Sequence, residues 1–157
     1  MDRLGIAWPE EVTLIELTTY LFDHLNAGTF AIRAAGDGAP HAYVDPSHAV
    51  RVSTREGTAR GNNASRALLA QATDTPLREL FWRDARAHPV GSTALQFTQP
   101  TLGESLTRVR LEDARQAGAK TIVSEDAGTL AQLARFAAEY GLQVKGLYEL
   151  LAENLRS

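Results

Sequence analysis

Residues 121–147, with the sequence TIVSEDAGTLAQLARFAAEYGLQVKGL, contain the pattern that decides the fold. The stretch opens on a short β-branched run, Thr121–Ser124, which is typical of a strand. Leucine, phenylalanine and alanine then recur at helical spacing as far as Tyr140, where a glycine follows and predicts the end of a helix. Gln143–Leu147 is predicted to be a second strand. A strand, a helix and a strand in this order predict two parallel strands joined by a crossover helix.

The rest of the chain continues the same alternation. Apolar residues at helical spacing, with glycine or proline stops, predict helices at Glu10–Asn26, Ala64–Ala72, Thr101–Ala117, from Asp126 or Thr129 to Tyr140, and at Tyr148–Leu155. Further strands are predicted at His41–Asp45 and Leu77–Trp82, while Thr29–Ile32 is either a strand or the packing end of the first helix. Residues 88–98 are predicted to form a loop. The pattern predicts one three-layer, Rossmann-like α/β domain over residues 1–157, with a parallel sheet of about four strands and crossover helices.

The composition excludes several classes of function. The chain has 157 residues, of which 44% are hydrophobic and 22% charged, as in an ordinary globular domain. It contains no cysteine, which excludes disulfides, thiolate nucleophiles and cysteine-ligated zinc or iron–sulfur clusters. A net charge of −3 gives no positive field that would recruit nucleic acid. No apolar run reaches the length of a membrane span, so we expect a cytoplasmic protein without membrane insertion.

Three loops that are far apart in the sequence are expected to meet in space. In open α/β sheets the ligand lies at the carboxyl ends of the strands. This rule places Asp45–His48, the His88–Gly91 turn and Ser124–Asp126 along one edge of the sheet. The sequence therefore predicts that a binding site, where there is one, is built from these loops.

The first of these loops also carries a family resemblance. Tyr43-Val44-Asp45-Pro46-Ser47-His48 resembles the Tyr-His-Asp-Pro-Cys-His motif of the cysteine-rich (CCG) domain, which occurs in heterodisulfide reductases, in the iron–sulfur component of glycolate oxidase and in lactate-utilisation iron–sulfur proteins. Arg66–Leu69 resembles the family's arginine and leucine pair on a helix. Ile122–Leu133 is similar to its Ile-Val-Thr-x-Cys-Pro-x-Cys-x-x-Gln-Leu motif, and Val144–Leu151 to its last strand and helix. The resemblance covers about residues 10–155 and implies the fold of the family.

The resemblance fails at the cysteines of the family. Matched position by position, these cysteines become Ser47, Pro89, Val90, Asp126 and Thr129, while Gly91 matches the glycine beside the paired cysteines. Proline, valine and threonine cannot replace thiolates at a soft metal or a cluster. The resemblance therefore implies the fold and the partners of the family, with no cluster, no zinc and no other cofactor.

Two other interpretations of the polar residues remain. His48, His88, Glu125 and Asp126 could bind a metal that accepts harder ligands, although their spacing matches no zinc motif. The competing interpretation, which we favour, is that Asp45 and His48 orient their own turn while Glu125 and Asp126 lie at the start of a helix.

An anion site is the second interpretation. Arg51, Arg55 and Arg60 surround Gly57 and Gly61 just before a predicted helix, whose first N–H groups are free to bind an anion. The glycine spacing and the lysine of a phosphate loop are missing, so a solvated loop is favoured here.

The function expected from the sequence is that of a non-catalytic protein. It would be a structural, regulatory or partner-binding relative of a redox-complex component, and its partner would be such a component or a second copy of the chain. The alternative is an enzyme or small-ligand binding protein that reuses the vacated edge of the sheet. A third interpretation is a fragment whose missing half holds the working cluster. The candidate ligand-binding residues are Asp45, Ser47, His48, Arg51, Gly91, Glu125, Asp126 and Thr129.

Overall fold

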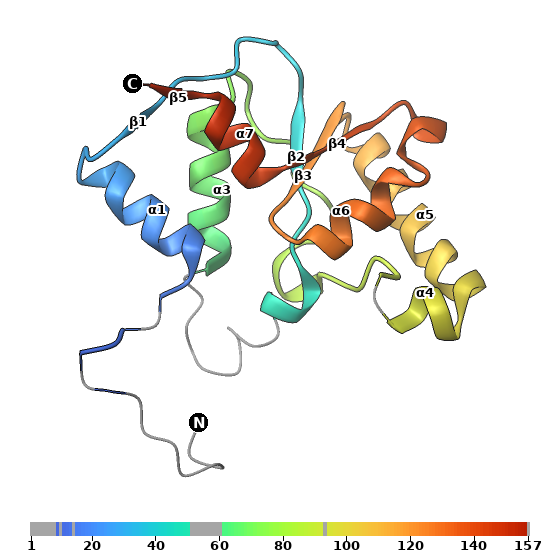
Figure 1. The fold of residues 1–157 in the computed structure, drawn as a ribbon. Coiled ribbons are helices and arrows are strands. Elements are labelled where there is room, and N and C mark those ends of the chain that lie inside the picture. Colours follow the sequence, from blue (N-terminus) through green and yellow to red (C-terminus); the bar gives the residue numbers. More distant parts are fainter. Residues whose placement is uncertain (1–8, 10, 14, 51–60, 93, 157) are drawn as a thin grey trace.

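A parallel sheet lies at the centre of the computed structural model, which describes residues 9, 11–13, 15–50, 61–92 and 94–156 (Figure 1). Its three strands, in the order β2-β3-β4, are His41–Tyr43, Thr121–Ser124 and Gln143–Gly146. In the register of the sheet, Ile122 lies between Ala42 and Val144. A separate two-stranded antiparallel sheet pairs β1 (Ala31–Ile32) with β5 (Leu155–Arg156).

Helices cover both faces of the parallel sheet. They are α1 (Leu17–Asn26), α3 (Gly61–Ala72), η2 (Asp84–Arg86), α4 (Ala94–Thr98), α5 (Pro100–Gln116), α6 (Ala127–Ala134), η3 (Ala137–Tyr140) and α7 (Leu147–Glu153). In Figure 1, α5 and α6 lie on one side of the sheet, and α3 and α7 lie on the other with α1 outside them. This arrangement confirms the predicted α/β fold. Within the described residues, no helix combines the length and the apolar character needed to cross a membrane.

Alternate residues of the strands build the two cores. Ala42, Val44 and Ile122 point toward α5 and α6, where Leu111 and Leu133 complete one fully buried cluster. The residues between them point the other way and pack on α3 and α7. This second cluster consists of Tyr43, Leu68, Leu69, Ala72, Val123, Leu147, Leu150 and Leu151. The central strand β3 is buried at all four positions, and its apolar Ile122 and Val123 belong to different clusters, as expected for a strand covered on both faces.

The sheet has three strands rather than about four, because Leu77–Trp82 is not a strand. Its backbone makes one hydrogen bond toward the sheet, from the Arg78 N–H to the His41 carbonyl (2.7 Å). The N–H groups of Phe81 and Trp82 instead donate to the Asp113 carboxylate on α5, each at 3.0 Å. Side chains of a helix thus take the place of a neighbouring strand.

Several element boundaries also differ from the sequence prediction. The first helix begins at Leu17 rather than residue 10, and the described residues just before it include β-branched Val12 and Ile15, which form helices poorly. The predicted loop at residues 88–98 contains the short helix α4. The last helix ends at Glu153, and the chain continues as β5.

The buried face of α5 includes two polar side chains, those of Thr107 and Arg110. Its buried residues are Gly103, Thr107, Arg110, Leu111 and Ala114, whereas Leu102 and Val109 are exposed. Thr107 donates a hydrogen bond to the Val90 carbonyl (2.7 Å), and Gly91, at φ +85°, lies against the backbone of Gly103. The loop before α4 is therefore held directly on α5.

This close approach gives a test of the fold. Gly91→Ala would place a methyl group 2.0 Å from the carbonyl oxygen of Gly103, and we expect it to lower the free energy of unfolding by about 3 kcal/mol or more. Gly118→Ala is the matched control, because Gly118 also has a positive φ (+78°) but no atom lies within 4 Å of an added Cβ. The control should cost about 1 kcal/mol in urea-induced unfolding followed by circular dichroism. Equal losses in the two variants would contradict the close approach.

Candidate functional site

The three loops predicted to meet at the carboxyl edge of the sheet enclose a hollow of about 230 Å³, which we call the edge hollow. It lies where helical residues 47–50 follow β2, where residues 88–92 precede α4, and where α6 follows β3. Its lining residues are Ser47, His48, His88, Pro89, Val90, Ser92, Ala94, Leu95, Asp126 and Thr129. All five residues matched to the cysteines of the family, Ser47, Pro89, Val90, Asp126 and Thr129, line this one space.

Asp126 and Thr129 use their polar groups within α6. The Asp126 carboxylate accepts a hydrogen bond from the Thr129 N–H at 2.6 Å, so Asp126 is the N-cap of the helix. Ser124, at the end of β3, donates to the Val44 carbonyl (3.0 Å) and so fastens the loop after β2. The prediction that Asp126 starts a helix is confirmed.

The two histidines of the edge hollow differ in their surroundings. His48 is exposed. His88 is half-buried, and its Nδ1 lies 2.9 Å from the Pro89 carbonyl. A carbonyl oxygen only accepts hydrogen bonds, so Nδ1 carries the proton and Nε2 is the nitrogen left to accept or to ligate. The ring packs edge-on against Trp82 at a centroid distance of 4.9 Å, which restricts its orientation.

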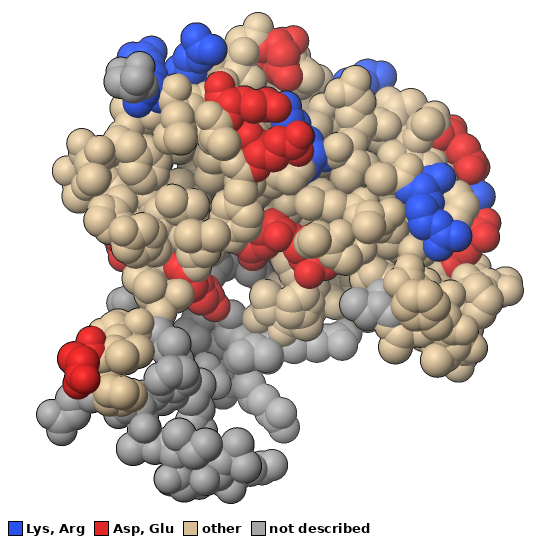
Figure 2. All heavy atoms as spheres, viewed as in Figure 1, with Lys and Arg blue, Asp and Glu red and all other residues tan. Residues whose placement is uncertain are grey.

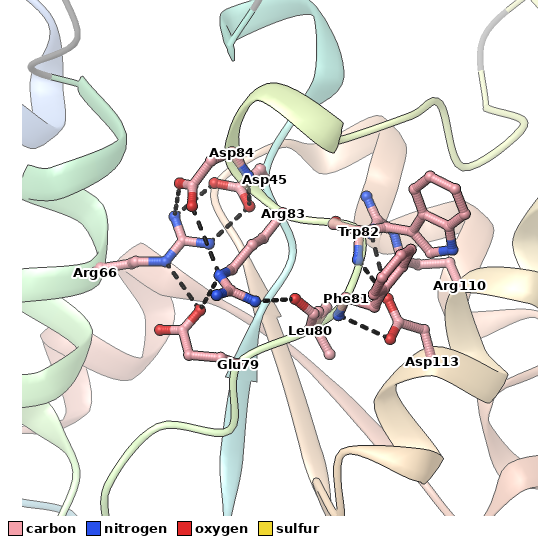
Figure 3. A network of polar contacts seen from close by, with 10 residues as sticks. All are labelled: Asp45, Arg66, Glu79, Leu80, Phe81, Trp82, Arg83, Asp84, Arg110 and Asp113. Carbon is pink, nitrogen blue, oxygen red and sulfur yellow. Dashed lines mark hydrogen bonds and ion pairs between the residues drawn. The ribbon is translucent and has the colours of Figure 1, made fainter.

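Asp45 is a structural residue beside this site. Its carboxylate is fully buried and accepts two hydrogen bonds from the Arg66 guanidinium, both at 2.7 Å (Figure 3). It also accepts the N–H of Asp84 at 3.2 Å. Asp84 has a positive φ of 50°, an uncommon conformation for a residue other than glycine, and this conformation accompanies the bond to Asp45. These contacts join β2, α3 and the loop before η2.

Glu125 lies on the opposite side of the sheet from the edge hollow. Its carboxylate accepts hydrogen bonds from Ser65 on α3 (3.0 Å) and from the Tyr148 hydroxyl on α7 (3.4 Å). Burial raises the pKa of Glu125, and these hydrogen bonds oppose the rise. Burial and the charge of Glu125 raise the pKa of Tyr148 to about 12. The hydroxyl of Tyr43 is buried nearby, and its burial together with the charge of Glu125 raises its pKa.

The predicted site residues are thus only partly brought together. Ser47, His48, Asp126 and Thr129 line the edge hollow, whereas Gly91 lies against Gly103 outside it. Asp45 is occupied by Arg66, and Glu125 lies on the α3 and α7 side of the sheet. Arg51 and most of the proposed anion loop lie outside the described residues.

The four proposed metal ligands do not form one cluster. His48, His88 and Asp126 line the edge hollow, and Glu125 does not. No group of three or more histidine, aspartate or glutamate side chains is arranged to hold a metal ion in the part of the chain that the structure describes.

Two important residues of α5 were missed by the sequence analysis. Arg110 is completely buried, and its guanidinium donates to the carbonyl of Trp82 (Figure 3). It also donates to the carbonyl of His88 at 3.4 Å. Burial lowers its pKa, and the nearby carboxylate of Asp113, 3.7 Å away, opposes this. Asp113 binds the N–H groups of Phe81 and Trp82. The spacing of Gly103, Thr107, Arg110 and Ala114, which places them on one face of a helix, was the available signal.

No protein-family model matches the chain, and neither a curated protein nor a solved structure was found to be similar to it.

The buried ion pair gives a prediction about stability. Arg66→Met leaves the carboxylate of Asp45 buried without its partner, so we expect the free energy of unfolding to fall by about 3 kcal/mol. Arg115→Met is the matched control, since Arg115 also makes a two-point pair with a carboxylate, that of Glu112 (2.7 and 2.6 Å), but at the exposed surface. The control should leave stability in urea nearly unchanged. Similar losses in both variants would contradict the role given to the Asp45–Arg66 pair.

The raised pKa of Glu125 predicts a pH dependence. The carboxyl group is protonated in both states at low pH, and its burial starts to cost stability as the pH rises through the pKa of the unfolded state, with the full cost reached above the pKa of the folded state. As the pH rises above about 4, the free energy of unfolding of the native chain should therefore fall relative to that of Glu125→Gln. Glu11→Gln, at an exposed position, is the control and should follow the native chain. Parallel pH profiles for Glu125→Gln and the native chain would show that burial of Glu125 has no such effect.

Proposed function

We propose that this chain is a cluster-free relative of the cysteine-rich (CCG) domain that acts as a structural, regulatory or protein-binding component and not as an enzyme. The supporting observation is the convergence of five residues. Ser47, Pro89, Val90, Asp126 and Thr129 were matched to the cysteines of the family by sequence resemblance alone, and they line one hollow of about 230 Å³. The parallel sheet brings the loops after β2 and β3 to one edge, and α5 holds residues 88–91 beside them. The resemblance adds which positions within these loops would face one space, and the lining of the hollow agrees with it, which supports the proposal.

Three of the five side chains, those of Pro89, Val90 and Asp126, either cannot bind a metal or already have another role. Proline and valine carry no ligand atom, and the Asp126 carboxylate is committed to the Thr129 N–H as a helix cap. Val90 belongs to the core beneath the sheet, and its carbonyl is bound by Thr107. Packing and hydrogen bonds hold the edge hollow open, so no metal is needed to stabilise it. This supports the cluster-free part of the proposal.

The size of the edge hollow favours a protein partner over a small ligand. Sites for small molecules usually enclose about 300–1,000 Å³, and the edge hollow, at about 230 Å³, is smaller. A space of this kind suits a single side chain of a docked protein, as in the central pockets of protein interfaces. The proposed partner is a component of a redox complex of the heterodisulfide reductase, glycolate or lactate oxidation type, or a second copy of the chain. The cytoplasmic location expected from the sequence belongs to the same proposal.

Metal analysis tests two parts of this proposal, the absence of a cluster and the likeness to the CCG domain. The native chain, purified without oxygen, should hold no stoichiometric iron or zinc and show no visible absorption from a cluster. A variant that combines Ser47→Cys, Pro89→Cys, Val90→Cys, Asp126→Cys and Thr129→Cys should bind iron and sulfide, or zinc, on reconstitution, since its five thiols would surround one space.

The outcomes separate the two parts. Stoichiometric metal in the native chain would overturn the cluster-free function. A folded five-cysteine variant that binds neither iron nor zinc would overturn the likeness to the family. Circular dichroism shows whether the variant is folded, and a variant with cysteines at only Ser47 and Asp126 is the control for adventitious metal binding by thiols.

A further inference from the structure

The most exposed large apolar side chain of the described residues lies beside the edge hollow. Phe97 on α4 is 81% exposed, and Ala94, three residues earlier on the same side of the helix, lines the hollow together with Leu95. Leu102, at the start of α5, is also exposed. We call Ala94, Leu95, Phe97 and Leu102 the α4 patch. It places a protruding aromatic ring next to a hollow of the size of a side chain.

The α4 patch also lacks charge. Residues 89–103 contain no lysine, arginine, aspartate or glutamate, although 22% of the whole chain is charged. Figure 2 shows the corner of the molecule at α4, at the lower right, without blue or red atoms. The other exposed phenylalanine, Phe81, differs in this respect, because the guanidinium of Arg86 lies 4.7 Å from the centre of its ring. A scarcity of charged residues around an exposed aromatic side chain is typical of the core of a protein interface.

We propose that the α4 patch and the edge hollow form a contact between two copies of this chain. Phe97 of each copy enters the edge hollow of the other, so that a two-fold axis brings the same surface of both copies together. This inference rests on the proposed function, because it names the partner that a protein-binding component would take.

Two observations favour a second copy over a different protein. The protruding ring and the hollow lie side by side on the same surface, and a self-complementary contact uses both, whereas a foreign partner would need only one of them. The chain also has a net charge of −3, so two copies repel each other where charged faces meet. An uncharged surface lets two copies approach without placing like charges opposite one another.

Sedimentation equilibrium of the full chain, from low micromolar to submillimolar concentration, tests this contact. The native chain should form a dimer whose population rises with concentration. Phe97→Ala should weaken association roughly tenfold or more, because an aromatic anchor is lost. Ala94→Trp should do the same by filling the edge hollow. Phe81→Ala, which removes an exposed phenylalanine outside the α4 patch, is the control and should associate as the native chain does.

Mixing the two disabled variants gives the sharpest readout. Phe97→Ala keeps an open hollow and Ala94→Trp keeps the phenylalanine, so a mixed dimer contains one complete insertion and should associate more tightly than either variant alone. A native chain that stays monomeric throughout, including one that binds a different protein at this surface, overturns the inference. A dimer that Phe97→Ala leaves unchanged overturns it too. Neither result affects the metal analysis, so the cluster-free function is judged separately.

Discussion

Side chains of α5 supply the hydrogen bonds that a neighbouring strand would otherwise give to residues 81–90. Asp113 accepts two backbone N–H groups, Arg110 donates to the Trp82 and His88 carbonyls, and Thr107 donates to the Val90 carbonyl. These residues recur every three positions along one face of the helix, which is why three side chains can follow a segment of chain. These hydrogen bonds fix the path of a segment that is only partly buried, with Ala87 and Val90 as its buried residues. The shape of the edge hollow depends on it, since His88, Pro89 and Val90 form one of its walls.

The part of the edge hollow formed by Ser47 and His48 follows Asp45, whose position depends on a different interaction, the ion pair with Arg66. Asp45 follows β2 and Arg66 lies on α3, so their two hydrogen bonds tie the first strand to the helix that covers it. The same carboxylate accepts the N–H of Asp84, which begins η2. One buried carboxylate therefore sets both the end of β2 and the path of the loop that α5 holds from the other side. A substitution of either Asp45 or Arg110 should therefore alter the shape of the edge hollow, although neither residue lines it.

The fold could be predicted where the determinants are local, and the site could be predicted only in part. The strand at Thr121–Ser124 was predicted at its observed bounds, and α5 within one residue at each end, because apolar spacing and flanking glycines are local signals. The strand predicted at Leu77–Trp82 was wrong because the partners of this segment are Arg110 and Asp113, about thirty residues further on, which no local pattern reveals. The convergence of the loops after β2 and β3 followed from the rule for parallel sheets, whereas the His88–Gly91 loop follows no strand of the sheet and is held beside them by α5. The direction of each side chain did not, since Glu125 and Asp126 are neighbours in the chain and yet lie on opposite sides of the sheet.

A hollow can persist without its ligands when its walls are held by contacts that do not involve the occupant. Each wall of the edge hollow meets this condition: the Asp126 cap holds α6, Gly91 packs on Gly103, and Ser124 binds the Val44 carbonyl. None of these contacts would change if the space were filled or left open, so the space is preorganised, and filling it costs little conformational entropy. In the proposed role, the preorganised hollow receives a side chain, and His48 and His88, whose Nε2 is left to accept a hydrogen bond, line it. The proposed binding role therefore rests on how the walls are made and not on what the space lacks.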